Sequence, residues 1–448
     1  MIIDILNSEQ DPAGRNIRAA IDKLIEENGK NAYPLFDGNE VTFHTSDERI
    51  INTGKDAINP DADLVIVVSR HSSVNPVPVL TVHPAGNFGV AQLGGNDREL
   101  SLCAPAWMKS VLQNHAKFVP DGYRVSYEIT HHGPTDFPVP SFFVEVGSTE
   151  TEWNDEKAYT AAAKSVLYAK PAAETIPLIG FGGTHYAVRQ SVIGKETKGA
   201  FGHMMHSRDV GTVTKEMISR MAEKSGGVSA AHIDRKAMTK EEAARIYRLL
   251  EELGIPEITE SELEQLNHVS YETWKKYLKF AADTDKELKI HPHGTISDGT
   301  PAKAEVPSDL FTLAFGKDDS TLMEWLEKRG DIFHTCGRSG KLMPIFLTDE
   351  KNSAKTSVAL IALAVQYITR SQETMVEGNT LTVIRRQFDP KLARTLGVPS
   401  GPLFGKLASG NAVTLADGKE ILPEMVTTVA ETTIEIPGME NYTHEINC

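Results

Sequence analysis

The stretch that decides the fold is DLVIVVSRHSS, residues 63–73. Its first part, residues 63–69, is dense in β-branched side chains and predicts a central strand. The run then changes to SRHSS, which offers a cation, an imidazole and several hydroxyls. In an open α/β sheet, ligands bind at the carboxyl ends of the strands. We therefore expect this polar segment to line a binding site.

Strands and helices alternate on both sides of this run. Hydrophobic runs predict further strands at residues 1–6, 123–130, 142–147 and 175–180. Helical spacing of apolar residues predicts helices at 15–28, 105–115, 155–170, 212–224, 240–253 and 260–282. We expect the strands at 123–130 and 142–147 to pair through the loop HHGPTDFPVP. The alternation favours an α/β fold whose mixed or mostly parallel sheet is covered by helices.

The length of 448 residues suggests two or three domains. Residues 283–307 are polar and rich in turn-forming residues, which predicts a linker there. It would separate a catalytic domain, residues 1–282, from a C-terminal α/β extension of unknown role, residues 308–448. In that extension ADGK, residues 416–419, predicts a hairpin turn. The H-P-H segment at 291–293 lies in the expected linker, and we expect no site there.

The formal net charge of -15 disfavours broad, non-specific binding of nucleic acid, because a polyanion is repelled at long range. It does not exclude RNA, since a local basic patch can hold a phosphate backbone. The stretch 189–224 is such a patch. Its candidate RNA-binding residues are Arg189, Lys198, Arg208 and Lys215.

The spacing of the cysteines and the lack of a long apolar segment indicate the cellular compartment. The three cysteines, Cys103, Cys336 and Cys448, are far apart and form no C-x-x-C, which argues against a disulfide framework. The first residues have no signal-peptide pattern. The apolar stretch 358–365 is far shorter than the roughly 20 residues of a membrane span. These features favour a protein of the reducing cytoplasm.

Histidines are concentrated in one part of the chain. Eight of the 15 lie between His71 and His206, mostly at predicted strand ends or in loops rich in Gly, Pro and Ser. Glycines in these loops would let backbone N–H groups approach a ligand closely. The candidate substrate-binding residues of these segments are Arg70, His71, Ser72, Gly86, Asn87, Gly182, Gly183 and Thr184.

Carboxylates accompany the histidines. Imidazoles and carboxylates together suit zinc ligation, or a general base with an orienting partner. The candidate catalytic residues are His83, Thr130, His131, His132, Glu145 and His185. Ranked by chemistry, with the ligand set left open, the candidate metal ligands are His83, His131, His132, Glu128, Glu145 and His185. The pair His203 and His206 could share one helical face, but a structural role is at least as well supported.

The chain has no G-x-S-x-G elbow, no H-E-x-x-H and no dinucleotide or P-loop fingerprint. Without an evident nucleophile, attack by water is the simpler mechanism. A metal or a histidine would activate that water. We expect N–H groups near Gly182–Gly183 or Gly86–Asn87 to stabilise the oxyanion.

Six ordered motifs carry a resemblance to a known family. They are DPAGRNI (11–17), SRHSS (69–73), LTVHPAGNFGVAQLGG (80–95), EITHHGP (128–134), FVEVGSTETEW (143–153) and GFGGTHYAVR (180–189). Together they closely resemble the archaeal and plant type of D-aminoacyl-tRNA deacylase, over roughly residues 1–280.

The resemblance implies properties that composition and spacing do not. It implies a phosphorylase/peptidyl-tRNA-hydrolase-like α/β domain and hydrolysis of the ester between a D-amino acid and the 3′-terminal ribose of tRNA, a chirality-proofreading step. It also implies two zinc ions per subunit. The partner would be D-aminoacyl-tRNA, with no DNA and no membrane, and the chain is expected to act as a monomer.

Two rival functions remain open at this point. A nucleosidase or peptidase-like hydrolase could use the same fold class, because fold does not fix function. A tRNA-binding factor without enzymatic activity could carry its histidines as structural residues. The C-terminal extension also contains GPLFGKLASGNAVTLADGKEI (401–421), which is similar to a stretch of tRNA 3′-end-processing ribonucleases of the metallo-β-lactamase type. Their metal motif is absent from the sequence, so the extension would aid tRNA binding or only stabilise the chain.

Overall fold

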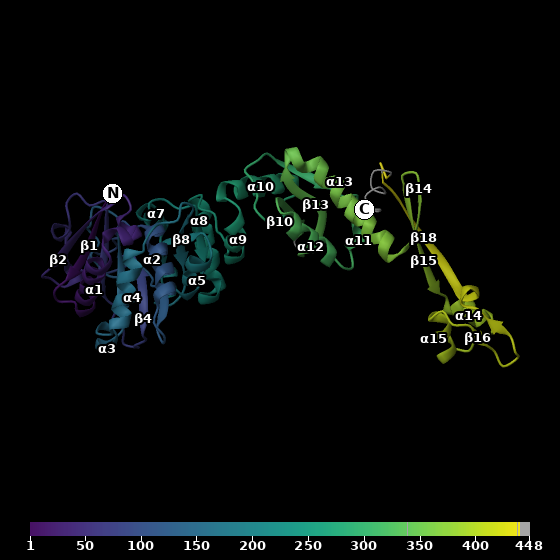
Figure 1. Ribbon diagram of the computed structural model, residues 1–448, viewed down its shortest axis with the longest axis horizontal. Helices are drawn as coiled ribbons and strands as arrows, with labels where there is room; N and C mark the ends of the chain where they lie inside the picture. Colours follow the sequence, from purple (N-terminus) through teal and green to yellow (C-terminus); the bar gives the residue numbers. More distant parts are fainter. Residues whose placement is uncertain (338, 437, 440–448) are drawn as a thin grey trace. The chain divides into compact units, whose positions relative to one another are not determined.

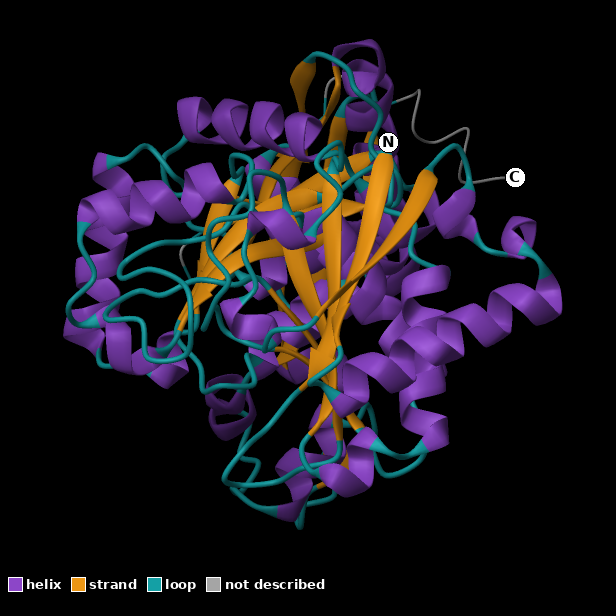
Figure 2. Ribbon diagram, turned by 90° about the vertical axis from the view of Figure 1, so that its left-hand side faces the viewer, coloured by secondary structure: helices purple, strands orange, loops and turns teal. Residues whose placement is uncertain are grey.

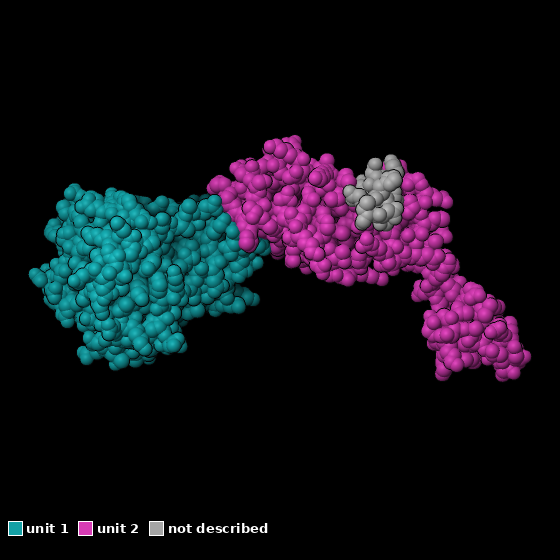
Figure 3. Space-filling view, viewed as in Figure 1, with its two compact units in different colours: residues 1–267 teal, residues 268–448 magenta. Residues whose placement is uncertain are grey.

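The computed structural model describes residues 1–337, 339–436 and 438–439 (Figure 1). The chain forms two compact units, Met1–Asn267 and His268–Cys448 (Figure 3). The division falls earlier than the predicted linker. Residues 283–307 are not a linker, because they contain β10 (Lys289–His293) and β11 (Pro301–Glu305), two strands of the second unit.

A six-stranded sheet forms the centre of the first unit. In sheet order its strands are β2 (Glu40–Ser46), β1 (Ile2–Ser8), β3 (Leu64–Arg70), β6 (Ser141–Gly147), β4 (Val79–His83) and β5 (Arg124–Tyr127). The first four are parallel; β4 runs antiparallel to β6, and β5 runs parallel to β4. This arrangement confirms the predicted mixed α/β fold.

A smaller parallel sheet completes the first unit. Its order is β8 (Gly199–Met205), β7 (Ile176–Phe181) and β9 (Ala230–Ile233). Helices flank the strands (Figure 2). They are α1 (Pro12–Asn28), α2 (Pro105–Phe118), α3 (Glu150–Trp153), α4 (Glu156–Leu167), α5 (Val188–Glu196), α6 (Ser207–Val210), α7 (Lys215–Lys224), α8 (Lys240–Glu252) and α9 (Glu260–Gln265).

The motif DPAGRNI starts α1 for a local physical reason. Asp11 is the N-cap, and its side chain accepts a hydrogen bond from the N–H of Gly14, while Pro12 fills the first helical position. The other carboxylate oxygen of Asp11 accepts from the N–H of Arg70 at the end of β3. One side chain therefore fixes the helix start against the strand end that carries SRHSS.

Three expectations about secondary structure are wrong. The strands at 123–130 and 142–147 do not pair, because β4 lies between β5 and β6. Residues 199–205 form strand β8, so His203 and His206 do not share a helical face. The helix expected at 260–282 is two helices, because Ser270 caps a new one, α10 (Tyr271–Thr284), beyond the unit boundary.

The segment that follows β5 joins the two sheets of the first unit. The N–H of Glu128 donates to the carbonyl of Val82 in β4, and the N–H of Thr130 donates to the carbonyl of Met204 in β8. The Thr130 hydroxyl accepts from the N–H of Met204 and lies 3.0 Å from Nδ1 of His203. Because His203 Nε2 must donate to the Ser101 carbonyl, its Nδ1 accepts the proton of the Thr130 hydroxyl.

The second unit contains its own sheets. An antiparallel sheet has the order β10, β12 (Ile332–Cys336), β13 (Leu342–Asp349), β11, and a second one has the order β14 (Glu373–Glu377), β15 (Thr380–Phe388), β18 (Thr427–Glu435). The ADGK turn joins β16 (Val413–Thr414) to β17 (Glu420–Ile421), as predicted. The helices after α10 are α11 (Ser308–Phe315), α12 (Ser320–Arg329), α13 (Glu350–Ser371), α14 (Pro390–Thr395) and α15 (Pro402–Ala408). Among the described residues, no helix has the length and apolar character needed to cross a bilayer.

We expect Thr130→Val to destabilise the first unit, whereas Thr130→Ser should not. Valine removes the hydroxyl and leaves the N–H of Met204 and Nδ1 of His203 buried without this partner. Each unpaired buried group costs about 1–3 kcal/mol. Serine keeps both hydrogen bonds and is the matched control. Chemical denaturation of both variants measures the difference; equal free energies of unfolding would contradict the role of the hydroxyl.

Candidate active site

Polar residues from five strand ends or strands meet in one place in the first unit. His71 follows β3, His83 ends β4, Glu145 lies in β6, and His185 follows β7. Glu128, His131 and His132 belong to the segment after β5. The imidazole ring centres of His83 and His131 are 4.3 Å apart, and those of His131 and His185 are 4.7 Å apart. The sequence prediction that these segments form one cluster therefore agrees with the structure.

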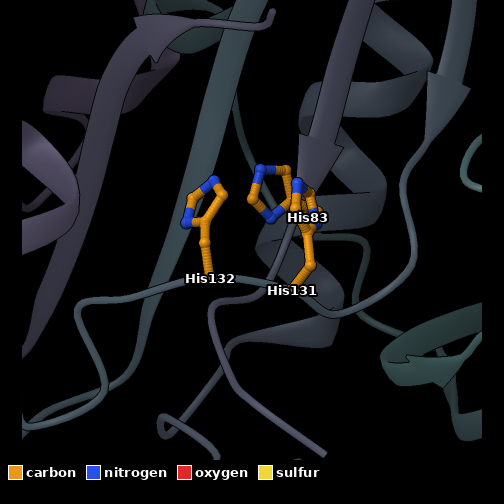
Figure 4. A group of neighbouring side chains, drawn as sticks. All are labelled: His83, His131 and His132. Atoms are coloured by element: carbon orange, nitrogen blue, oxygen red, sulfur yellow. The ribbon is translucent and has the colours of Figure 1, made fainter. Parts of the chain in front are cut away.

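Backbone carbonyls set the orientation of three of these rings. Nδ1 of His83 lies 3.2 Å from the carbonyl oxygen of Pro84, and Nδ1 of His131 lies 2.8 Å from that of Ile129. Nδ1 of His132 lies 2.7 Å from the carbonyl oxygen of Gly133. A carbonyl can only accept, so each Nδ1 carries the proton and Nε2 is left to face the cluster (Figure 4). Metal-binding histidines are typically held in this way.

Glu128 is the central carboxylate of the cluster and is fully buried. Its oxygens lie 3.0 Å from Nδ1 of His71, 3.0 Å from Nε2 of His185 and 3.4 Å from Nε2 of His131. These contacts have ion-pair distances, but among the described residues neither oxygen has a partner aligned as a hydrogen bond. Nε2 of His83 is likewise buried without an aligned partner in the described chain. Buried ligand atoms that converge without hydrogen bonds fit a metal ion.

Two carboxylates and His71 set the charge of the cluster. Burial alone would lower the pKa of His71, but Glu128 and Glu145 outweigh it and raise that pKa to about 11. Burial would raise the pKa of Glu145, but the nearby imidazoles of His71 and His83 hold it well below its usual value. Ser69 steadies the same carboxylate, because its hydroxyl donates to Glu145 over 2.6 Å. Without a metal, the cluster thus holds a buried ion pair.

His131 and His132, in the loop after β5, have lowered pKa values, in contrast to His71. Burial lowers the pKa of His132 to about 4, with the nearby His83 acting in the same direction. Burial and His83 also hold the pKa of His131 well below its usual value. Both rings are therefore neutral near pH 7, which is the protonation state that a metal requires of a histidine ligand.

The cluster contains three overlapping groups of side chains that could hold a metal ion. His71, Glu128 and His185 form one group, and His83, His131 and His132 form another; within each group the ligand atoms lie within 4.8 Å of one another. His83, Glu128 and Glu145 form a third group that overlaps both. The predicted ligand list therefore lacked His71, which sequence reasoning placed only among substrate-binding residues. Imidazole and carboxylate ligands of this kind suit zinc.

Two cavities open onto the cluster and share four lining residues, Leu93, His131, His132 and His185. The smaller cavity, about 350 Å³, is also lined by Asp11, Arg70, His71, Ser72 and Glu145. The larger cavity, about 670 Å³, is also lined by Gly86, Asn87, Phe88, Thr130 and Arg208. Most of the predicted binding residues therefore line one or the other. Gly182, Gly183 and Thr184 do not line either cavity, and Thr184 lines a third one, beside Arg124 and Lys195.

The backbone N–H groups expected to stabilise an oxyanion already donate hydrogen bonds to other groups of the protein. Those of Gly86 and Asn87 donate to the carbonyls of His132 and Glu99. Those of Gly182 and Gly183 donate to the carbonyl of Met205 and the hydroxyl of Ser207. The expected oxyanion role is therefore wrong for all four. The glycines instead permit tight turns, since Gly182 and Gly183 have φ of 90° and 107°.

His203 and His206 lie outside the metal-ligand groups of the described residues. His203 is buried in β8 and holds Thr130 in place, so its role is structural. His206 is the N-cap of α6, where its side chain accepts from the N–H of Arg208. The alternative of a structural role for this pair fits the structure.

The predicted basic patch is largely neutralised by acidic neighbours. Ion pairs join Arg189 to Glu260 at 2.9 Å, Lys198 to Glu174 at 2.9 Å, Lys215 to Glu252 at 3.1 Å, and Arg208 to Asp209 at 3.6 Å. Of these four, Arg208 lines a cavity of the site. On the other cavity, sequence reasoning missed Arg49, which lines it together with Arg70.

Asp11, Ser69 and Tyr186 support the site but were not among the predicted site residues. The hydroxyl of Tyr186 lies 3.1 Å from Nε2 of His71. All three lie inside the quoted motifs, and Ser69 and Tyr186 are next to a residue that was chosen. Position in a motif was the available signal, but the contacts depend on tertiary packing.

We expect Gly147→Ala to weaken metal binding, because Gly147 packs directly against His71. An added Cβ would lie 2.5 Å from Cβ of His71 and 2.8 Å from its carbonyl oxygen, so the ring must move. Displacing a supporting contact typically costs about 10–100-fold in metal affinity. Gly89→Ala is the control, since a Cβ there meets nothing within 4 Å. Calorimetric titration with zinc compares them, and equal affinities would contradict the placement of His71.

Comparisons with known proteins agree on one family. A model of the D-aminoacyl-tRNA deacylase family matches residues 58–258. The chain is 66% identical over 442 residues to the D-aminoacyl-tRNA deacylase of Methanocorpusculum labreanum, covering 99% of this chain and 100% of that protein. It is 41% identical over 445 residues to the enzyme of the same name from Methanosphaerula palustris, covering 99% and 100%.

A solved structure supports the same fold for more than half of the chain. It is a crystal structure described as that of a conserved protein of unknown function, 26% identical, with a TM-score of 0.52. The match covers 59% of this chain and 96% of the other. With two relatives above 40% identity along nearly the whole chain, the protein belongs to the D-aminoacyl-tRNA deacylase family.

Proposed function

We propose that the first unit hydrolyses the ester bond between a D-amino acid and the 3′-terminal ribose of tRNA, releasing the free amino acid and tRNA. Family membership supports the substrate class. The observation that carries the proposal is the buried histidine and glutamate cluster at the junction of two cavities. An ester substrate has two parts that diverge from its carbonyl, and two cavities meeting at one reactive cluster suit that shape.

We assign the amino acid to the smaller cavity. Asp11 and Glu145 line it, and a carboxylate can receive the α-ammonium group. A steric contact in a pocket of about 350 Å³ selects the D-isomer by about 1–3 kcal/mol. The terminal adenosine then occupies the larger cavity, where Phe88 offers a ring for stacking and Arg208 a cation for phosphate. Arg49 and Arg70 line the smaller cavity, on the side of the amino-acid part of the substrate.

The two ligand groups would hold two zinc ions, one at His71, Glu128 and His185 and one at His83, His131 and His132. Zinc in such a site polarises the carbonyl oxygen and lowers the pKa of water toward about 7. Polarisation of the carbonyl by zinc would matter here, because the backbone N–H groups of the glycine-rich loops already donate to other protein groups.

The protein side chains have distinct roles in the reaction. The carbonyl contacts at Nδ1 of His83, His131 and His132 keep the Nε2 atoms directed at the position of the ion that they would hold. Glu145, steadied by Ser69, accepts a hydrogen bond from the attacking water and orients it toward the carbonyl. The surrounding buried side chains exclude other water molecules, which strengthens every charge interaction with the reacting carbonyl. In this proposal a single chain in the cytoplasm carries out the reaction, with all the assigned residues in the first unit.

We expect alanine at His83, His131, His132 or His185 to reduce turnover of D-tyrosyl-tRNA by about 100-fold or more, with folding retained, because each change removes a group that positions the reacting atoms. His44→Ala is the control, since His44 lies in β2 and pairs with Asp4 outside the site. The assay measures release of D- and L-tyrosine from charged tRNA, with and without a chelator. Wild-type rates in all four variants would overturn the assignment of the site.

We expect zinc binding to release protons and to strengthen as pH rises. The pKa of His71 is raised to about 11, so its ring carries a proton that zinc must displace at pH 7. Below pH 11 this displaced proton changes the affinity by about tenfold per pH unit. Calorimetry in buffers of different ionisation enthalpy counts the protons. Zinc binding without proton release would contradict the role of His71 as a ligand.

A further inference from the structure

A second group of potential metal ligands lies in the second unit, on strands β10 and β12. The two strands are antiparallel, with His291 opposite His334 and Lys289 opposite Cys336. Residues opposite one another share a face of the sheet, and so do residues two apart on one strand. His291, His334 and Cys336 therefore project from one face. One ligand atom from each lies within 4.8 Å of the other two.

The orientation of the central histidine is fixed by a fourth residue. Nε2 of His293 lies 2.7 Å from Nδ1 of His334, so this pair shares one hydrogen bond. This contact occupies Nδ1 of His334, so its Nε2 is the atom that can bind a metal ion. The His291 ring stacks on the His334 ring, with centres 4.8 Å apart. A histidine held at one nitrogen and directed by the other is the arrangement expected beside a metal.

The group is embedded in the sheet rather than spread over a surface. His334 is 8% exposed and Cys336 is 6% exposed. Ile332, on the same face of β12, packs into the hydrophobic core with Leu322 and Leu326 of α12. On this buried face of the sheet, imidazole and thiol groups occupy positions where apolar side chains would otherwise pack. A bound ion would compensate for the free energy of apolar burial that is lost.

We propose that His291, His334 and Cys336 bind a zinc ion, with His293 as the residue that orients His334. Thiolate and imidazole are ligands that zinc favours, and three protein ligands leave a fourth position for water. In a tetrahedral zinc site the ligand atoms are separated by roughly 3.5 Å. The site lies wholly within the second unit and uses no residue of the deacylase site.

The proposed zinc ion would link the edge strand β10 to β12. β10 is at one end of its sheet and has only β12 as a strand neighbour among the described residues. A metal held by one residue of β10 and two of β12 joins the strands through side chains in addition to their backbone hydrogen bonds. Metal binding to the folded state alone stabilises that state by mass action.

Cobalt in place of zinc tests the proposal in the full chain. The deacylase site has no cysteine in its ligand groups, so a sulfur-to-cobalt charge-transfer band reports a thiolate ligand such as Cys336. We expect this band in the wild-type protein and its loss in Cys336→Ser. Cys103→Ala is the matched control, because Cys103 is a buried cysteine of the first unit whose thiol contacts Ser225. It should keep the band.

Zinc content provides a second measurement. We expect Cys336→Ser and His334→Gln to bind about one ion fewer per chain than the wild type, with turnover of D-tyrosyl-tRNA unchanged. His268→Gln, a change to an exposed histidine of the same unit, should keep the full content. A wild-type chain without the charge-transfer band, or a band that persists in Cys336→Ser, would overturn the proposal. Failure of this test would leave the deacylase proposal untouched, because activity is measured separately.

Discussion

Three hydrogen bonds from imidazole Nδ1 atoms to backbone carbonyls are the constraint on which the site depends. They hold His83, His131 and His132 in one tautomer, with Nε2 facing the same small volume. Since the acceptors belong to the backbone at positions adjacent to each ring or two residues away, the orientation is set by local chain conformation. The cluster is therefore arranged for a ligand before any ligand binds, and the cost of ordering these rings is met during folding.

The position of the cluster follows from how two sheets meet. The segment after β5 bonds to β4 on one side and to β8 on the other, so Glu128 lies where both sheets end. Both cavities open at this junction, and they share the histidines that belong to neither sheet. A single parallel sheet would offer one crevice at its strand ends. Two sheets joined by a short polar segment offer two, which suits a substrate whose halves differ in size and charge.

Much of the first unit's secondary structure and site could be predicted from the sequence, because the sequence patterns that indicate them are local. The run 63–69, the strand ends that follow such runs, and the Asp11 cap depend on residues close together in the chain. The order of strands β5, β4 and β6 depends on partners far apart, as does the Thr130 contact with Met204 over 74 residues. The use of the glycine N–H groups by internal carbonyls, and the contact of His71 with Glu128, likewise follow from tertiary packing. Periodicity carries no information about such pairings.

The contact between Thr130 and β8 also bears on when the site can form during synthesis. A nascent chain leaves the ribosome from its N-terminus, and His71, His83 and Glu128 emerge well before Met204. Until β8 has emerged and docked, the segment that carries Glu128 lacks its second neighbour, and the loop with His131 and His132 is held on one side only. The candidate metal ligands therefore reach their final positions late in translation, after the larger sheet has condensed. A metal bound at these residues would meet a nearly complete unit and would not direct its early folding.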